Sequence, residues 1–365
     1  MRLVVAPDKF AGTLTAVEAA DAIAEGWRRT TADEITTVAM ADGGPGFVDV
    51  LHAGLGGQIL AVTVRGPLGS PVPATLLLVN GTAFLESAQA CGLALMPSGH
   101  GGVEDASTYG VGELVAEAVA AGARRIVVGL GGSGTNDGGA GLLAALGATS
   151  QPAGALTAGV SGLSQLAAVD LEPARARLAG IELVAATDVE NPLLGLRGAT
   201  NVYGPQKGIA ADRLIEVDGA LTRFAHLADR PPADAKGAGA AGGLGYALLL
   251  LGAKREPGFA VVADAVGLPG AIRSADLVLT GEGKLDWQSM TGKVVSGVAS
   301  LAGEAMRPCV VIAGIVQVGA RELRANGIES AYSLVDVVGD DAARNDPAES
   351  LATVAARVAR TWSRR

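Results

Sequence analysis

Short apolar runs, separated by segments of helix length, recur near both ends of the chain. Residues 2–6 (RLVVA) are typical of a buried strand, and the segment that follows predicts a helix with Thr15 as its N-cap and Glu18 completing a capping box. Further strands are predicted at 34–40, 276–280, 309–314 and 331–336. Because helical segments separate these five runs, we expect one parallel sheet, as in α/β proteins.

The middle of the chain predicts a second domain that is inserted into the first. It begins with three β-rich runs, ILAVTVRG, VPATLLLV and TAFLES, and continues with a helix at about 108–122 and the strand RRIVVGL. We therefore expect residues 61–268 to form an inserted domain, and residues 1–60 and 269–365 to form a discontinuous outer domain. A chain of 365 residues agrees with two domains.

The composition supports an α/β protein and argues against several other classes. Hydrophobic residues make up 49% of the chain but aromatic residues only 3%, so Ala, Val, Leu and Ile must build the core. The net charge of −9 opposes binding to nucleic acid, and no apolar run approaches the ~20 residues of a membrane span. We expect a cytoplasmic protein in which Cys91 and Cys309 are buried, reduced thiols.

The stretch GLGGSGTNDGGAG, at 129–141, follows a predicted strand and leads into the small-residue helix AGLLAALGA. A glycine loop between a strand and a helix brings backbone N–H groups close to an anion, so we expect phosphate to bind here. Residues 129–134 match G-x-G-x-x-G, but no acidic residue follows at the spacing that dinucleotide folds use, and no Walker A sequence is present. A tightly packed turn is the alternative.

Polar groups also crowd just beyond several other predicted strands. Asp8 and Lys9 follow the first strand, and ADGG follows the second. The segment TDVENP follows the run ELVAA, and GEGKLDWQSMTGK follows the run DLVLT. The carboxyl ends of parallel strands are where α/β proteins bind ligands, although any single aspartate is more often a turn former. GPQKG and GAGAAGGLG add a lysine and a second glycine-rich helix entrance. Oxygen ligands for Mg²⁺, lysines and glycine loops are the parts of a phosphoryl-transfer site.

Together with APDKFAGTLTA and GATNVYGPQKG, these segments resemble the bacterial type of the glycerate kinase family, in the family's order, from residue 4 to about 297. The resemblance implies ATP and Mg²⁺ as cosubstrates, D-glycerate as acceptor and 2-phosphoglycerate as product. It also implies two α/β domains, one flavodoxin-like and one inserted, with the active site in the cleft between them. The chain departs from the family pattern at Ala11, where a lysine is common, and at Pro45 and Phe47, where Glu and Thr are usual.

Roles for individual residues follow as hypotheses. We expect the nucleotide to be bound by Gly131, Gly132, Ser133, Thr135, Asn136, Asp137, Lys207 and Lys293. The acceptor would be held by Asp8, Lys9, Asp42, Gly43 and Gly44, with Lys9 as the catalytic cation that meets the glycerate carboxylate. Asp188 and Asp286 are candidates for coordinating Mg²⁺ or for accepting the proton of the attacking hydroxyl.

Three other functions deserve comparison. GLGGSGT resembles the phosphate loop of the GHMP small-molecule kinases, but the remaining motifs fit that family poorly. A nicotinamide-dependent dehydrogenase would need the glycine loop to bind a dinucleotide. A non-catalytic binding module would keep the glycine loops yet lose the aspartates, which are present here. For the assembly, symmetry statistics favour a homodimer if the protein is oligomeric.

Overall fold

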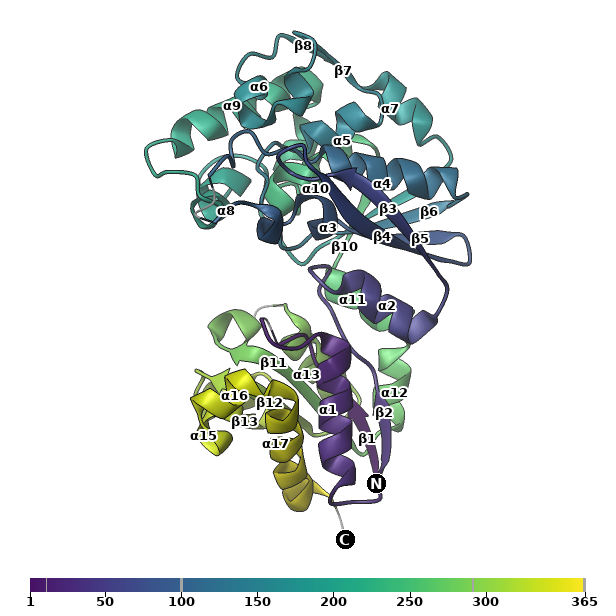
Figure 1. Cartoon of the computed structure of the whole chain (residues 1–365), viewed down its shortest axis with the longest axis vertical. Coiled ribbons are helices and arrows are strands. Elements are labelled where there is room, and N and C mark those ends of the chain that lie inside the picture. Colours follow the sequence, from purple (N-terminus) through teal and green to yellow (C-terminus); the bar gives the residue numbers. More distant parts are fainter. Residues whose placement is uncertain (11, 99–100, 291, 364–365) are drawn as a thin grey trace. The chain divides into compact units, whose positions relative to one another are not determined.

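The computed structural model describes residues 1–10, 12–98, 101–290 and 292–363, and its chain divides into two units (Figure 1). The terminal unit contains Met1–Asp42, Asp49–Gly56 and the C-terminal part from Phe259. The central unit contains Gly43–Val48 and Gly57–Gly258. The helices α2 (Phe47–Leu55) and α11 (Gly258–Ala265) lie at the points where the chain passes from one unit to the other.

The terminal unit is built on one five-stranded parallel sheet in the order β13-β12-β11-β1-β2. Its strands are β1 (Arg2–Val5), β2 (Glu34–Thr37), β11 (Leu277–Leu285), β12 (Cys309–Val316) and β13 (Ile328–Ser333). Two strands thus come from the start of the chain and three from its end. The prediction of one parallel sheet in an α/β fold is confirmed.

Helices cover both faces of this sheet. Leu3 and Val5 pack in one core cluster with α1 (Ala16–Arg28) and α17 (Pro347–Trp362), whereas Val4, between them, is buried on the opposite face. Helix α1 has the predicted capping box, because Thr15 accepts a hydrogen bond from the Glu18 N–H and Glu18 accepts one from the Thr15 N–H. The other helices of this unit are α12 (Leu268–Ser274), α13 (Val294–Glu304), α14 (Ala320–Ala325), α15 (Leu334–Val338) and α16 (Asp340–Asn345).

The predicted end of the last strand was wrong. The expected run 331–336 belongs to β13 only as far as Ser333, and α15 begins at Leu334. The Ser333 hydroxyl accepts a hydrogen bond from the Asp336 N–H, so it caps this helix. A helix N-cap directly after an apolar run therefore ends the strand three residues earlier than the hydrophobic pattern suggests.

The central unit is built on a mixed six-stranded sheet in the order β10-β9-β6-β5-β4-β3. Its antiparallel part is β3 (Gln58–Arg65), β4 (Pro71–Val79) and β5 (Thr82–Glu86), which coincide with the three predicted β-rich runs. Its parallel part continues with β6 (Arg125–Gly129), β9 (Glu182–Ala186) and β10 (Lys254–Glu256). A separate antiparallel pair is formed by β7 (Thr149–Gln151) and β8 (Ala168–Asp170).

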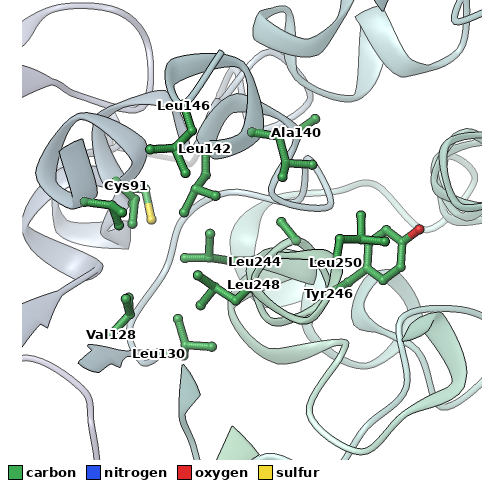
Figure 2. Packing of buried hydrophobic residues seen from close by; sticks show 14 of the residues in the cluster. Cys91, Val128, Leu130, Ala140, Leu142, Leu146, Leu244, Tyr246, Leu248 and Leu250 are labelled. Atoms are coloured by element: carbon green, nitrogen blue, oxygen red, sulfur yellow. The ribbon is translucent and has the colours of Figure 1, made fainter. Parts of the chain in front are cut away.

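Aliphatic side chains fill the core of the central unit, as the low aromatic content predicts. Figure 2 shows Leu142, Leu244 and Leu248 together with Cys91 in this cluster. The helices are α3 (Ala88–Cys91), α4 (Tyr109–Ala120), α5 (Ala140–Ala145), α6 (Gly159–Leu163), α7 (Glu172–Arg177), α8 (Ala199–Lys207), α9 (Leu214–Ala228) and α10 (Ala240–Leu250). Cys91 and Cys309 are buried free thiols, as predicted, and burial raises the pKa of each to about 12. Within the described residues, each helix is too short or too polar to span a membrane.

Candidate functional site

The glycine loop of the central unit joins β6 to α5. It begins beside β9, where Gly129 pairs with Ala186 and the Leu130 N–H donates to the Ala186 carbonyl at 3.0 Å. A Cβ atom on Gly131 would lie 2.5 Å from the Gly44 Cα, so the loop packs directly against the backbone of the 43–46 segment. Gly132 is exposed and has a φ of +69°, which favours glycine. Gly131 and Gly132 are the accessible part of this loop.

Asp137 occupies the helix end at which we expected a phosphate. Its carboxylate is fully buried and accepts hydrogen bonds from the Thr108 N–H and hydroxyl, both at 2.8 Å, and from the Gly139 and Gly141 N–H groups, at 3.0 and 3.1 Å. The Thr108 hydroxyl in turn accepts from the Leu142 N–H. These amides therefore already have an acceptor within the protein. The structure thus gives the Asp137 carboxylate a role in capping α5, and a contact between Asp137 and the nucleotide stays a prediction.

Lys207 and Asn136 also point into the protein. The Lys207 ammonium donates to the Ser133 hydroxyl at 2.9 Å and to the Thr135 carbonyl at 2.7 Å, and the side chain is buried. Burial lowers the pKa of Lys207 to about 8, although the nearby Asp137 carboxylate opposes this shift. The Asn136 amide donates to the Thr200 hydroxyl on α8. The structure thus brings Lys207 to the glycine loop, where it holds the loop from inside.

Asp188 lies in the turn that follows β9. The Thr187 hydroxyl accepts a hydrogen bond from the Val189 N–H, which shapes this turn, and Asp188 itself is partly exposed. Because β9 and β6 are neighbouring parallel strands, Asp188 and the glycine loop lie at the same end of the central sheet. The other candidate for Mg²⁺ coordination, Asp286, belongs to the terminal unit.

The terminal unit contains a cavity of about 390 Å³ beyond the carboxyl ends of β1 and β11. These are the strands between which the sheet order changes direction, the position at which open α/β sheets bind ligands. Charged residues from β11 and from the loops after β1, β2 and β11 line this cavity: Asp8, Lys9, Asp42, Glu282, Lys284, Asp286 and Lys293. Residues of α15 and α16 and Phe10 also line it.

Two predicted carboxylates in this cavity have opposite electrostatic environments. Burial raises the pKa of Asp8 to about 6, against the effect of Lys9, whose ammonium lies 3.7 Å from the Asp8 carboxylate. Asp286 is paired with Lys284 at 3.1 Å and accepts a hydrogen bond from the Gln288 N–H at 2.9 Å. Although burial opposes them, these contacts lower the pKa of Asp286. Asp286 therefore stays ionised at neutral pH.

Glu282 is a cavity residue that the sequence interpretation missed. It lies on β11, which continues to Leu285 instead of ending at Thr280. Its Oε1 atom is buried and has no hydrogen-bond partner in the described part of the chain. Burial raises the pKa of Glu282 to about 7, and the Asp8 carboxylate adds to the rise. Its place inside the GEGKLDWQSMTGK segment was the available signal.

The ADGG segment does not form a single site within one unit. Asp42 lines the cavity of the terminal unit, whereas Gly43 and Gly44 belong to the central unit and pack near the glycine loop. Phe47 is fully buried, with its ring 6.2 Å from that of Phe84, so it is a core residue. Pro45 lies in the turn before α2. Ala11, the third departure from the family pattern, lies outside the described residues.

The oxygen-rich donor set suits Mg²⁺, which usually binds one or two carboxylates together with substrate phosphates. Each unit has one candidate carboxylate: Asp188 follows β9 in the central unit, and Asp286, which is ionised at neutral pH as a ligand must be, lies in the terminal unit. No group of three or more His, Cys, Asp or Glu side chains in the described ranges is arranged to hold a metal by itself. The residues therefore fit a metal that arrives with a nucleotide better than an all-protein metal centre.

Comparison with known proteins assigns the family. The model of the glycerate kinase family matches residues 3–363. The chain belongs to the glycerate kinase family. It is 40% identical over 345 residues to a glycerate kinase of Bacillus subtilis strain 168, covering 92% of this chain and 90% of that protein. It is 38% identical over 349 residues to the glycerate 2-kinase of Escherichia coli K12, covering 93% of this chain and 92% of that protein.

A solved structure agrees with this assignment. The crystal structure of a protein from Salmonella typhimurium LT2 aligns with a TM-score of 0.83 at 38% sequence identity, covering 99% of this chain and 98% of that one. The similarity thus extends over both units, and it includes the α/β architecture with its two main sheets.

Proposed function

We propose that this member of the glycerate kinase family transfers the γ-phosphoryl group of ATP to D-glycerate and releases ADP and 2-phosphoglycerate. The observation that carries the proposal is the charged cavity of the terminal unit, in a chain that matches glycerate kinases over nearly its full length. Lysines suit the carboxylate of glycerate, and carboxylate oxygens suit its two hydroxyl groups. Phosphoryl transfer needs mainly positioning and charge neutralisation, which these groups supply.

We also propose that the terminal unit is a flavodoxin-like domain, that the central unit is a domain inserted into it, and that transfer takes place in a cleft between them. Numbered in chain order within its own sheet, the terminal sheet has the order 2-1-3-4-5, which supports the flavodoxin-like assignment. Chain connectivity supports the cleft. Asp42 lines the terminal cavity, and the next residue, Gly43, begins the segment that packs near the glycine loop.

In this proposal the nucleotide phosphates bind at the accessible backbone of Gly131 and Gly132. Ser133 and Lys207 act by holding this loop, since their side chains hydrogen-bond to each other. Lys293, which lines the terminal cavity, supplies a positive charge for the phosphates. Mg²⁺ held by Asp188 and Asp286 would neutralise charge on the phosphates when it is bound.

The acceptor would lie among Asp8, Lys9 and Asp42. The C2 hydroxyl of glycerate is adjacent to the carboxylate, whereas the C3 hydroxyl is one carbon further away. A cation that binds the carboxylate close to the transfer site therefore places the C2 oxygen nearer to the γ-phosphate. Lys9 is our choice for this cation, because its ammonium lies beside the Asp8 carboxylate in the cavity.

The test uses enolase, which accepts 2-phosphoglycerate but not 3-phosphoglycerate. The protein is incubated with ATP, Mg²⁺ and D-glycerate, the reaction is quenched, and enolase is added without phosphoglycerate mutase. Immediate formation of phosphoenolpyruvate is the expected result. A product that enolase converts only after mutase is supplied would refute the C2 assignment, and the absence of any phosphoglycerate would refute the proposed activity.

A further inference from the structure

Glu282 stands at the change of direction in the terminal sheet, on the far end of β11. Strand β1 ends at Val5, so β11 extends beyond its neighbour, and the Asp8 N–H donates to the Gly281 carbonyl at 2.8 Å. This hydrogen bond fixes the loop after β1 beside the residue that precedes Glu282. As a result, the Glu282 and Asp8 side chains line the same cavity, together with Lys293 from the start of α13.

The other carboxylates of the cavity are already engaged. Asp8 is paired with Lys9, Asp286 with Lys284 at 3.1 Å, and Asp340, on α16, with Arg344 at 2.9 Å. No ion pair involves Glu282 within the ranges that the structure describes, and its buried Oε1 atom lacks a hydrogen-bond donor there. The Glu282 carboxyl group has a side-chain hydrogen bond with Ser289, but a buried oxygen without a donor costs free energy, so Oε1 needs a partner that the described residues do not provide.

We infer that Glu282 is the catalytic residue that accepts the proton of the attacking glycerate hydroxyl. This inference rests on the proposed function. In the step, the hydroxyl oxygen forms a bond to the γ-phosphorus of ATP, and the bond between that phosphorus and the β,γ-bridging oxygen breaks. The hydroxyl proton moves to Oε1 of Glu282, ADP leaves with the bridging oxygen, and the carboxyl group later releases its proton to water.

The electrostatics of the cavity suit a base that works near neutral pH. Burial raises the pKa of Glu282 to about 7, whereas the pKa of Asp286 is lowered, so Asp286 is the weaker base of the two. Because the base must be ionised, kcat should fall as the pH drops below about 7. The charged groups that line the cavity with Glu282 are Asp8, Lys9, Asp42, Lys284, Asp286 and Lys293, together with Asp340 and Arg344 from α16.

The test compares Glu282→Gln, which keeps the shape of the side chain but cannot accept the proton, with Glu282→Asp, which keeps a carboxylate. We expect kcat of Glu282→Gln to fall by about 10²–10⁴-fold with a small change in the KM for glycerate, and its decline at low pH to disappear. Glu282→Asp should recover part of kcat and keep the decline at low pH. The matched control is Glu329→Gln, an exposed carboxylate on β13 of the same sheet, which should change neither.

The outcomes separate the inference from the proposed function. If the unmodified protein phosphorylates glycerate and Glu282→Gln keeps kcat within threefold, or keeps the same decline at low pH, Glu282 is not the proton acceptor. If the unmodified protein does not phosphorylate glycerate, the proposed function fails and the inference fails with it. If Glu282→Gln does not fold, the test rests on Glu282→Asp. A pH profile of kcat for Glu282→Asp that shows no decline at low pH would then overturn the inference.

Discussion

Replacing Asp137 should damage the stability of the central unit far more than it damages nucleotide binding. In Asp137→Ala, the N–H groups of Thr108, Gly139 and Gly141 lose their acceptor, and all three residues are buried. An unsatisfied buried donor costs about 1–3 kcal/mol, so three donors that relax partly should cost about 3–5 kcal/mol. That is a large part of the roughly 5–15 kcal/mol by which a domain is stable.

Asp137→Asn is the milder perturbation and tests the same reasoning. The Oδ2 atom of Asp137 accepts three of the four hydrogen bonds, and Oδ1 accepts only that of the Gly139 N–H. An asparagine whose oxygen takes the Oδ2 position keeps the three and loses the fourth. We therefore expect a loss of about 1–3 kcal/mol, smaller than that of the alanine variant.

Thermal unfolding of the full chain provides the assay, with Asp212→Asn, an exposed aspartate in the same unit, as the control. At about 2–4 °C per kcal/mol, Asp137→Ala should lower Tm by roughly 10 °C, and the control should stay within about 1 °C. ATP titration of the folded variants completes the measurement. An unchanged Tm for Asp137→Ala, combined with a tenfold weaker affinity for ATP, would refute the capping role and support Asp137 as a nucleotide ligand.

Two further predictions concern the glycine loop and the carboxylates of the cavity. In denaturant unfolding, Gly131→Ala should destabilise the protein by about 1–3 kcal/mol, because the new Cβ would lie 2.5 Å from the Gly44 Cα. The control is Gly303→Ala, at a helical position with no atom within 4 Å of the new Cβ, which should be neutral or slightly stabilising. The pKa of Glu282 is raised to about 7 on folding, so its contribution to stability is present below the unfolded pKa of about 4.5 and is lost as the pH rises to about 7. At 1.36 kcal/mol per pKa unit, this loss of folding stability is at most about 3 kcal/mol. Glu282→Gln should therefore flatten the dependence of Tm on pH between about 4.5 and 7.5. An unchanged slope in the variant would contradict the raised pKa of Glu282.

The sequence contained enough information for the framework of the terminal unit. Strands that are buried on both faces appear as continuous apolar runs, so they could be predicted without an alternation of apolar and polar residues. The capping box of α1 could be predicted because its residues are close in sequence. Helical segments separate the apolar runs along the chain, and such segments are long enough for the crossovers that join parallel strands, so the sheet could be predicted to be parallel. The error at 331–336 arose where two local signals competed, an apolar run and the Ser333 cap.

Glu282 escaped prediction because the end of β11 is decided by its partner strand. Lys284 pairs with Ile315 and Leu285 with Val316, so β12 extends β11 across the residues GEGKL, whose glycines and charges are typical of a loop. A polar segment continues as a strand when a long neighbour supplies its hydrogen bonds. This tertiary effect carries Glu282 into the cavity, and the local sequence indicates it only through the place of Glu282 inside the GEGKLDWQSMTGK segment.

The glycine loop shows how polar residues of a predicted phosphate loop can form hydrogen bonds within the protein itself. Asp137, an anion from the chain itself, accepts from the amides at the start of α5, and the buried Lys207 ammonium donates to the Ser133 hydroxyl and the Thr135 carbonyl. These hydrogen bonds order the loop before any nucleotide arrives, which lowers the entropy cost of binding, although Oγ1 of Thr135 and Oδ1 of Asn136 have no partner among the described residues. What remains for a phosphate is the accessible backbone at Gly131 and Gly132. Side-chain substitutions in this loop should consequently act on nucleotide affinity through stability and loop shape, whereas changes at these two glycines should act on it directly.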